Sequence, residues 1–102
     1  MMIDGLSLIG AGTDSCIVDS RQLITMQNYK TIVMKNNCIV TGFYIRSSSN
    51  FAFGYGISAN GQAGLITQNK FSEGNKGIEL RNSNIKIYRN HFFNIRNGIT
   101  VW

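Results

Sequence analysis

The sequence predicts an all-β fold, a single-stranded parallel β-helix of about four to five short coils. The unit Gly77-Ile78 returns as Gly98-Ile99, a spacing of 21 in sequence number. Between the two units, Ile85 and Ile87 alternate with polar neighbours, which is the two-residue period of a strand with one buried face. A short polar break follows each apolar run. Strands and turns that repeat in this way are typical of a solenoid.

Three apolar columns appear when the chain is aligned on this repeat. We call the difference in residue number between equivalent positions of successive coils the step. The last step is 21 (66 to 87), the one before it is 26 (40 to 66), and the first is taken as 22 (18 to 40). Side chains one coil apart should then lie over one another at about 4.8 Å. Burying one Ile or Leu contributes roughly 1.5–3 kcal/mol, so these stacks should supply most of the stability. The columns are Leu6, Ile32, Ile57, Ile78 and Ile99; Val18, Val40, Ile66 and Ile87; and Leu23, Ile45, Phe71 and Phe92.

Composition fits one domain, residues 1–102. The chain has 102 residues, 43% of them hydrophobic, with 11 glycines and no proline, which suits a chain of strands and frequent turns. No apolar run approaches the ~18 residues of a membrane span, so no membrane partner is predicted. The net charge of +5 is spread singly and favours a solubilising outer face over a nucleic-acid site. No secretory signal is visible at the start of the chain.

The first coil is predicted at residues 3–23 and the second at 24–50. In the first, Gly10-x-Gly12 lacks the Lys-Ser/Thr of a phosphate-binding loop and the helix of a dinucleotide fold, so neither is predicted. In the second, strands are expected at 31–34 and 38–40. About five extra residues should follow it, around Phe51, Phe53 and Tyr55. These aromatic side chains should fold back over the coil, the alternative being that they stack on sugar rings.

Two pairs of residues recur at equivalent positions. Asn69 and Asn90 precede Phe71 and Phe92 at a turn, where stacked asparagines should satisfy backbone groups, so both are predicted to be structural. Cys16 and Cys38 each begin a Cys-Ile-Val triplet. They should form a stacked pair of reduced core thiols, with a disulfide left open. Two thiols and a distant histidine do not make a zinc site, so no metal and no cofactor is predicted.

The stretch 8–18, Leu-Ile-Gly-Ala-Gly-Thr-Asp-Ser-Cys-Ile-Val, resembles the opening coil of right-handed parallel β-helix (pectin-lyase-like) proteins, as in polysaccharide lyases and phage tailspikes. The later Asn-x-Phe and Gly-Ile-x-Leu units resemble the repeat of the same family. The resemblance implies a right-handed coil, a polysaccharide partner, acidic ones included, and an extracellular or virion-surface location. The pattern still reads as strand at its end, so we expect a fragment of a longer solenoid, covered by further coils of a parent chain or by other copies, as in a homotrimer.

The carboxylates do not predict a complete active site. Asp4, Asp14 and Asp19 fall in the first coil, while Glu73 and Glu79 should face different sides of the coil. Calcium-dependent lyases group carboxylates on one face, and glycoside hydrolases need a carboxylate pair. The sequence therefore leaves catalysis undecided, and the resemblance implies a lyase or hydrolase activity only for a longer parent.

One outward ladder remains as a candidate binding site. Gln22, Tyr44, Lys70 and His91 stand one residue before the third column, with Gln68 and Arg89 two positions earlier. A cation, an imidazole and a phenol at coil spacing are suited to hold an acidic sugar. The sequence thus predicts carbohydrate binding at Tyr44, Lys70, Arg89 and His91. The alternatives are a solvated wall on a purely structural solenoid or shaft, and, least favoured, a nucleic-acid surface.

Overall fold

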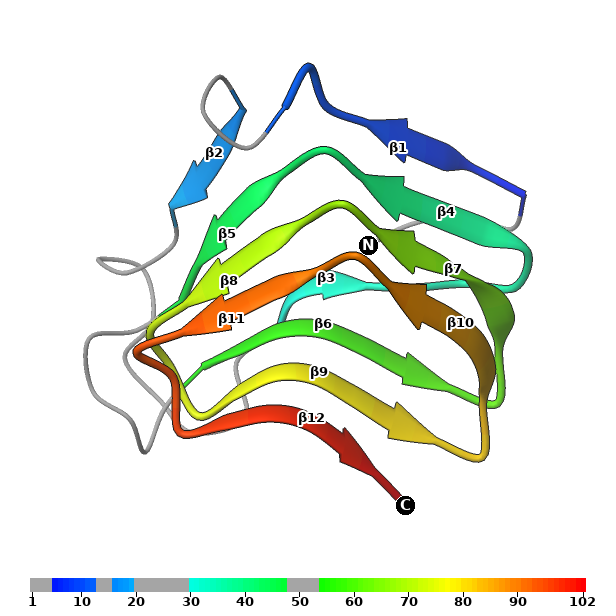
Figure 1. Cartoon of the computed structure of the whole chain (residues 1–102). Coiled ribbons are helices and arrows are strands. Elements are labelled where there is room, and N and C mark those ends of the chain that lie inside the picture. The colour runs from blue at the N-terminus through cyan, green and yellow to red at the C-terminus, as the bar shows by residue number, and fades with distance from the viewer. Residues whose placement is uncertain (1–4, 13–15, 20–29, 48–53) are drawn as a thin grey trace.

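The computed structural model describes residues 5–12, 16–19, 30–47 and 54–102. In these residues all strand pairings are parallel, and the strands form three four-stranded sheets, which are stacked as four coils around one interior (Figure 1). The predicted parallel β-helix is therefore confirmed. Sheet A holds β1 (Ser7–Ile9), β4 (Cys38–Thr41), β7 (Ala63–Thr67) and β10 (Asn84–Tyr88). Sheet B holds β2 (Ile17–Asp19), β5 (Tyr44–Arg46), β8 (Lys70–Ser72) and β11 (His91–Phe93). Sheet C holds β3 (Lys30–Val33), β6 (Tyr55–Asn60), β9 (Lys76–Arg81) and β12 (Asn97–Val101).

Each sheet contributes apolar side chains to the interior, and one column in each sheet corresponds to a predicted column. From the second coil onward these columns are the predicted ones, and the rings of Phe71 and Phe92 lie parallel, with centroids 4.9 Å apart. Val40, Ile45 and Ile57 are almost completely buried. No helix in the described part of the chain is long and apolar enough to cross a membrane. The observed columns are Leu8, Val40, Ile66 and Ile87; Val18, Ile45, Phe71 and Phe92; and Ile32, Ile57, Ile78 and Ile99.

The predicted register of the first coil is wrong. Val18 belongs to the sheet B column, and Leu8 takes the place predicted for Val18 in sheet A. The steps run from position 8 to 40 and from 18 to 45, both longer than predicted, because the first coil has longer connections than the later coils. Leu6 precedes β1 and is 39% exposed, so it is not a member of the Ile32 column. Leu23 lies outside the described residues.

The extra residues predicted to follow residues 24–50 are confirmed by the strand register. The step to the third coil is 26 in sheets A and B (40 to 66 and 45 to 71), but 21 in sheet C (57 to 78). The additional length therefore falls between β5 and β6. Phe51 and Phe53 lie outside the described residues, whereas Tyr55 begins β6 and is only 6% exposed.

The corners of the coil repeat one backbone conformation. Gln68 and Arg89, one coil apart, have φ of 56° and 57°, and Glu73 and Asn94 have φ of 64° and 50°. This left-handed region is costly for residues other than glycine, so the turn must be held by its surroundings. The same corner geometry in successive coils keeps the step constant and the columns aligned.

At Gly56 and Gly77, the glycines of two Gly-Ile units, the interior leaves no room for a side chain. A Cβ atom on Gly77 would lie 2.8 Å from Cε2 of Phe92 and 2.7 Å from the carbonyl oxygen of Gly98. A Cβ atom on Gly56 would lie 3.0 Å from Cδ2 of Phe71. The absent side chain thus makes room for the phenylalanine rings of sheet B.

An asparagine ladder closes the corner between sheets A and B. The amide oxygen of Asn69 accepts a hydrogen bond from the backbone N–H of Phe43 at 3.0 Å, and its nitrogen donates to the carbonyl of Val40 at 3.0 Å. Asn90 repeats both contacts one coil later, to the N–H of Asn69 and the carbonyl of Ile66. Asn69 is only 1% exposed, so the ladder satisfies backbone groups that water does not reach.

We predict that Gly77→Ala lowers the free energy of unfolding by about 1–3 kcal/mol, because the new methyl group overpacks the interior against Phe92. Gly98→Ala is the matched control, since its Cβ atom would meet ring atoms of the same Phe92 at 3.5 Å or more. Its effect should stay within about 1 kcal/mol. Urea denaturation measures the free energy of unfolding of both variants. An equal decrease in the two would contradict the steric explanation.

We predict that Asn69→Ala costs about 2–4 kcal/mol, because it leaves the Phe43 N–H and the Val40 carbonyl without their partner in a buried corner. Asn97→Ala serves as control. Asn97 is exposed and donates to Asn75 only at 3.4 Å, so its loss should cost less than about 0.5 kcal/mol. Thermal or chemical unfolding of the two variants decides, and an Asn69→Ala protein as stable as Asn97→Ala would refute the ladder's role.

Candidate functional site

The outer face of sheet B carries the predicted ladder. The strand register places Tyr44, Lys70 and His91 in one column, and Phe93 stands in the next outward column, level with Ser72. We call Tyr44, Lys70, His91 and Phe93 the sheet B patch. His91 and Phe93 are exposed, whereas Tyr44 and Lys70 are half-buried. Gln22 lies outside the described residues.

The sheet B patch combines a cation with aromatic rings. The ammonium nitrogen of Lys70 is 5.1 Å from the ring centroid of Tyr44 and 5.9 Å from that of Phe93. The His91 ring meets the Phe93 ring edge-on at 5.3 Å. The hydroxyl groups of Tyr44 and Ser72 share a hydrogen bond of 2.8 Å, which holds the phenol in place. The patch is therefore a fixed amphipathic surface rather than a row of independent side chains.

Arg89, the fourth predicted binding residue, lies outside the strands of sheet B. It occupies the corner between β10 and β11, and its guanidinium carbon is 6.0 Å from the ring centroid of Tyr88. Arg46, in the column of Phe93, forms ion pairs with Asp19 at 4.0 Å and Glu73 at 3.6 Å. These two carboxylates offset the charge of Arg46, so Lys70 is the main positive group of the patch itself.

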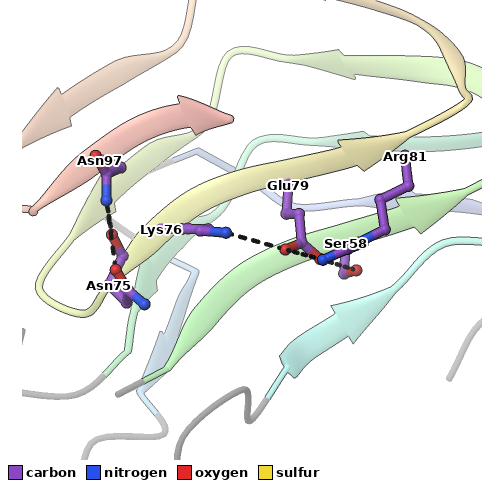
Figure 2. A network of polar contacts seen from close by, with 6 residues as sticks. All are labelled: Ser58, Asn75, Lys76, Glu79, Arg81 and Asn97. Carbon is purple, nitrogen blue, oxygen red and sulfur yellow. Dashed lines mark hydrogen bonds and ion pairs between the residues drawn. The ribbon is translucent and has the colours of Figure 1, made fainter. Parts of the chain in front are cut away.

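A second polar cluster, on the outer face of sheet C, was not predicted. Its centre is Glu79 of β9, which is only 1% exposed. The carboxylate accepts hydrogen bonds from Lys76 at 3.2 Å and from the hydroxyl of Ser58 at 3.3 Å, and Arg81 pairs with it at 3.7 Å. Figure 2 shows Lys76 and Arg81 approaching this carboxylate from opposite ends of β9, with Ser58 on the neighbouring β6. As predicted, the two glutamates face different sides of the coil. Glu79 lies on sheet C, whereas Glu73 forms an ion pair with Arg46 of sheet B.

The first residues of β9, Lys76, Gly77 and Ile78, produce this cluster. In a regular strand, residues three apart point to opposite faces, so Lys76 and Glu79 should not meet. Here the Cβ position of Gly77 points at Phe92 and the next residue, Ile78, is fully buried, so two successive positions face the interior. Lys76 and Glu79 consequently share the outer face. The pattern Lys76-x-Ile-Glu79-x-Arg81, with no side chain at Gly77, is the signal in the sequence.

A hollow lies beside Glu79. Its volume is about 330 Å³, and Trp102, which is 61% exposed, stands at one side of the cluster. Arg81 is 4.5 Å and Lys76 is 4.9 Å from the Trp102 ring centroid. Lys76 also lies 5.0 Å from the ring of Tyr55. The hollow is lined by Lys30, Tyr55, Ser58, Asn60, Glu79 and Arg81.

The two cysteines do not form the predicted stacked pair. Cys38 begins β4 in sheet A and pairs with Gly64, whereas Cys16 directly precedes β2 in sheet B. The predicted alignment of Cys16 with Cys38 is wrong for the same reason as that of Val18 with Val40. The long connections of the first coil place the Cys16-Ile17-Val18 triplet at sheet B instead of sheet A. Neither cysteine is in a disulfide bond, and the thiol of Cys16 accepts a hydrogen bond from the Ala11 N–H at 3.1 Å. Among the described residues no group of three or more His, Cys, Asp or Glu side chains gathers as metal ligands do.

Comparison with known proteins assigns the chain to a family without assigning an activity. No curated protein and no solved structure matches the chain. One family model, described as a protein of unknown function (DUF1565), matches residues 8–101, which run from the second residue of β1 to the last residue of β12. The chain therefore belongs to the DUF1565 family.

Proposed function

We propose that this chain is a carbohydrate-binding segment of a β-helix, and that the sheet B patch contacts the polysaccharide. The observation that carries the proposal is the position of the Lys70 ammonium over the rings of Tyr44 and Phe93, next to exposed His91. An exposed ring offers an apolar face to the C–H groups of a pyranose. A neighbouring cation and imidazole offer hydrogen bonds to hydroxyl or carboxylate groups.

The shape of the wall suits a polymer. Strands of successive coils lie about 4.8 Å apart, so the patch presents its groups as an extended flat surface across three coils. The resemblance to pectin-lyase-like proteins supports polysaccharide, acidic types included, as the ligand and an extracellular or virion-surface setting. It also supports further coils of a parent chain, or a homotrimer, as the protein partners.

We predict that the chain binds acidic oligosaccharides on a glycan array, and that Lys70→Ala and His91→Ala each weaken the binding. Loss of one hydrogen bond to a charged group costs about 1.5–3 kcal/mol, so each dissociation constant should rise about tenfold or more. Titration of the best array ligand, followed by amide chemical shifts, gives the constants.

Lys86→Ala is the matched control, because it removes the same charge from an exposed position on β10, in sheet A. Its affinity should equal that of the unchanged protein. If Lys86→Ala weakens binding as much as Lys70→Ala, the effect is one of net charge and the patch is not the site. A chain that binds no glycan but forms a stable oligomer in light scattering would instead favour the purely structural solenoid.

A further inference from the structure

The hollow on sheet C carries an excess of positive charge that is fixed in place. Among the described residues, Lys30 and Arg81 line it and Lys76 stands beside it, against the one carboxylate of Glu79. The register explains the arrangement, because Lys30, Tyr55 and Lys76 occupy one outward column on successive coils. The side chain of Lys30 is exposed. Around the hollow the positive groups thus outnumber the negative one, so an anionic group is attracted.

Glu79 holds the cations in position. A buried carboxylate is costly unless it is paired and hydrogen-bonded, and this one has both Lys76 and Ser58 as donors, with Arg81 paired to it. The ion pair with Arg81 uses Nη2, while the side chain of Arg81 remains 48% exposed. A guanidinium group has five N–H donors in a rigid plane, so Arg81 can bind a second carboxylate while it stays paired. Trp102, at 4.5 Å from the Arg81 guanidinium carbon, further fixes this plane.

The rest of the lining is suited to hydroxyl groups. The exposed Asn60 supplies an amide with donors and an acceptor, while Ser58 and Glu79 lie behind it, almost completely buried and hydrogen-bonded to each other. A small inorganic anion can pair with Arg81 and Lys30 but has no polyol chain to bond to Asn60 at the same time. A ligand with hydroxyl groups satisfies both kinds of partner. The volume of about 330 Å³ is at the lower end of ligand pockets, which suits a molecule the size of one sugar unit.

We propose that this hollow is a binding site for a small polyhydroxylated carboxylate, whose carboxylate pairs with Arg81 and Lys30 and whose hydroxyl groups bond to the exposed amide of Asn60. The site lies on sheet C and shares no residue with the sheet B patch. The proposal for this site is therefore independent of polysaccharide binding by the sheet B patch. The chemistry is recognition only, and no covalent step is involved.

The test is a titration of the chain with three probes: gluconate, glucitol and inorganic phosphate. Gluconate and glucitol share a six-carbon polyol skeleton and differ in the carboxylate, whereas phosphate is an anion without a polyol chain. We predict that gluconate shifts the amide signals of Ser58, Asn60 and Glu79, and that glucitol and phosphate bind at least about tenfold more weakly. Equal or tighter binding of phosphate would overturn the proposal in favour of a simple anion site. Equal binding of glucitol, or no binding of gluconate, would overturn it as well.

Two variants and their matched controls locate the site. Lys30→Ala removes an exposed side chain that lines the hollow, and Arg81→Ala removes the exposed guanidinium, so each should weaken gluconate binding about tenfold. Lys86→Ala and Arg96→Ala remove the same charges from exposed positions outside the hollow and should change nothing. Lys70→Ala should leave gluconate affinity unchanged, which separates this site from the sheet B patch. Loss of affinity in the control variants, with Lys30→Ala and Arg81→Ala no worse, would overturn the proposal.

Discussion

The pairing of each coil with the next is the interaction on which the rest of this structure depends. Among the described residues all strand pairings are parallel and join different coils, so no coil can satisfy its backbone or bury its side chains alone. The apolar columns follow from that pairing, because residues in register point the same way. Val40 and Ile66 are completely buried, since each has a neighbour in the coils before and after it.

Register depends in turn on the corners. The asparagine ladder at Asn69 and Asn90 and the left-handed residues Gln68 and Arg89 repeat the same turn one coil later, so strands leave each corner in the same direction. Gly77 adds a steric requirement, because only a residue without a side chain fits beside the Phe92 ring. These local features keep one coil over the next.

The same features explain what could be predicted from the sequence. From residue 38 onward, apolar columns, the extra residues after β5 and the outward ladder of Tyr44, Lys70 and His91 all follow from regular steps. The first coil could not be placed, because two identical Cys-Ile-Val triplets suggested a short step, while Cys16 and Cys38 belong to different sheets. The connections between the strands of the first coil are longer than those of later coils, and the repeat in the sequence does not indicate such a difference in length. The hollow beside Glu79 was missed because its formation requires two successive inward residues at Gly77, which simple alternation does not predict.

The stacking of the coils also produces the polar clusters on the outer faces of the sheets. A residue that faces outward in one coil is placed next to its equivalents in other coils, so single charges distant in sequence become clusters. Lys70 meets Tyr44 and Phe93 in this way on sheet B, and Ser58 meets Glu79 on sheet C. The positive charges scattered along the chain are thus gathered by the fold rather than by any local motif.

The register of the first two coils is the most direct test of this account, and backbone nuclear Overhauser effects between neighbouring parallel strands measure it. The structure predicts contacts between the backbones of Val18 and Ile45 and between those of Leu8 and Val40. Backbone contacts between Val18 and Val40, without any between Val18 and Ile45, would contradict it and restore a constant step along the whole chain.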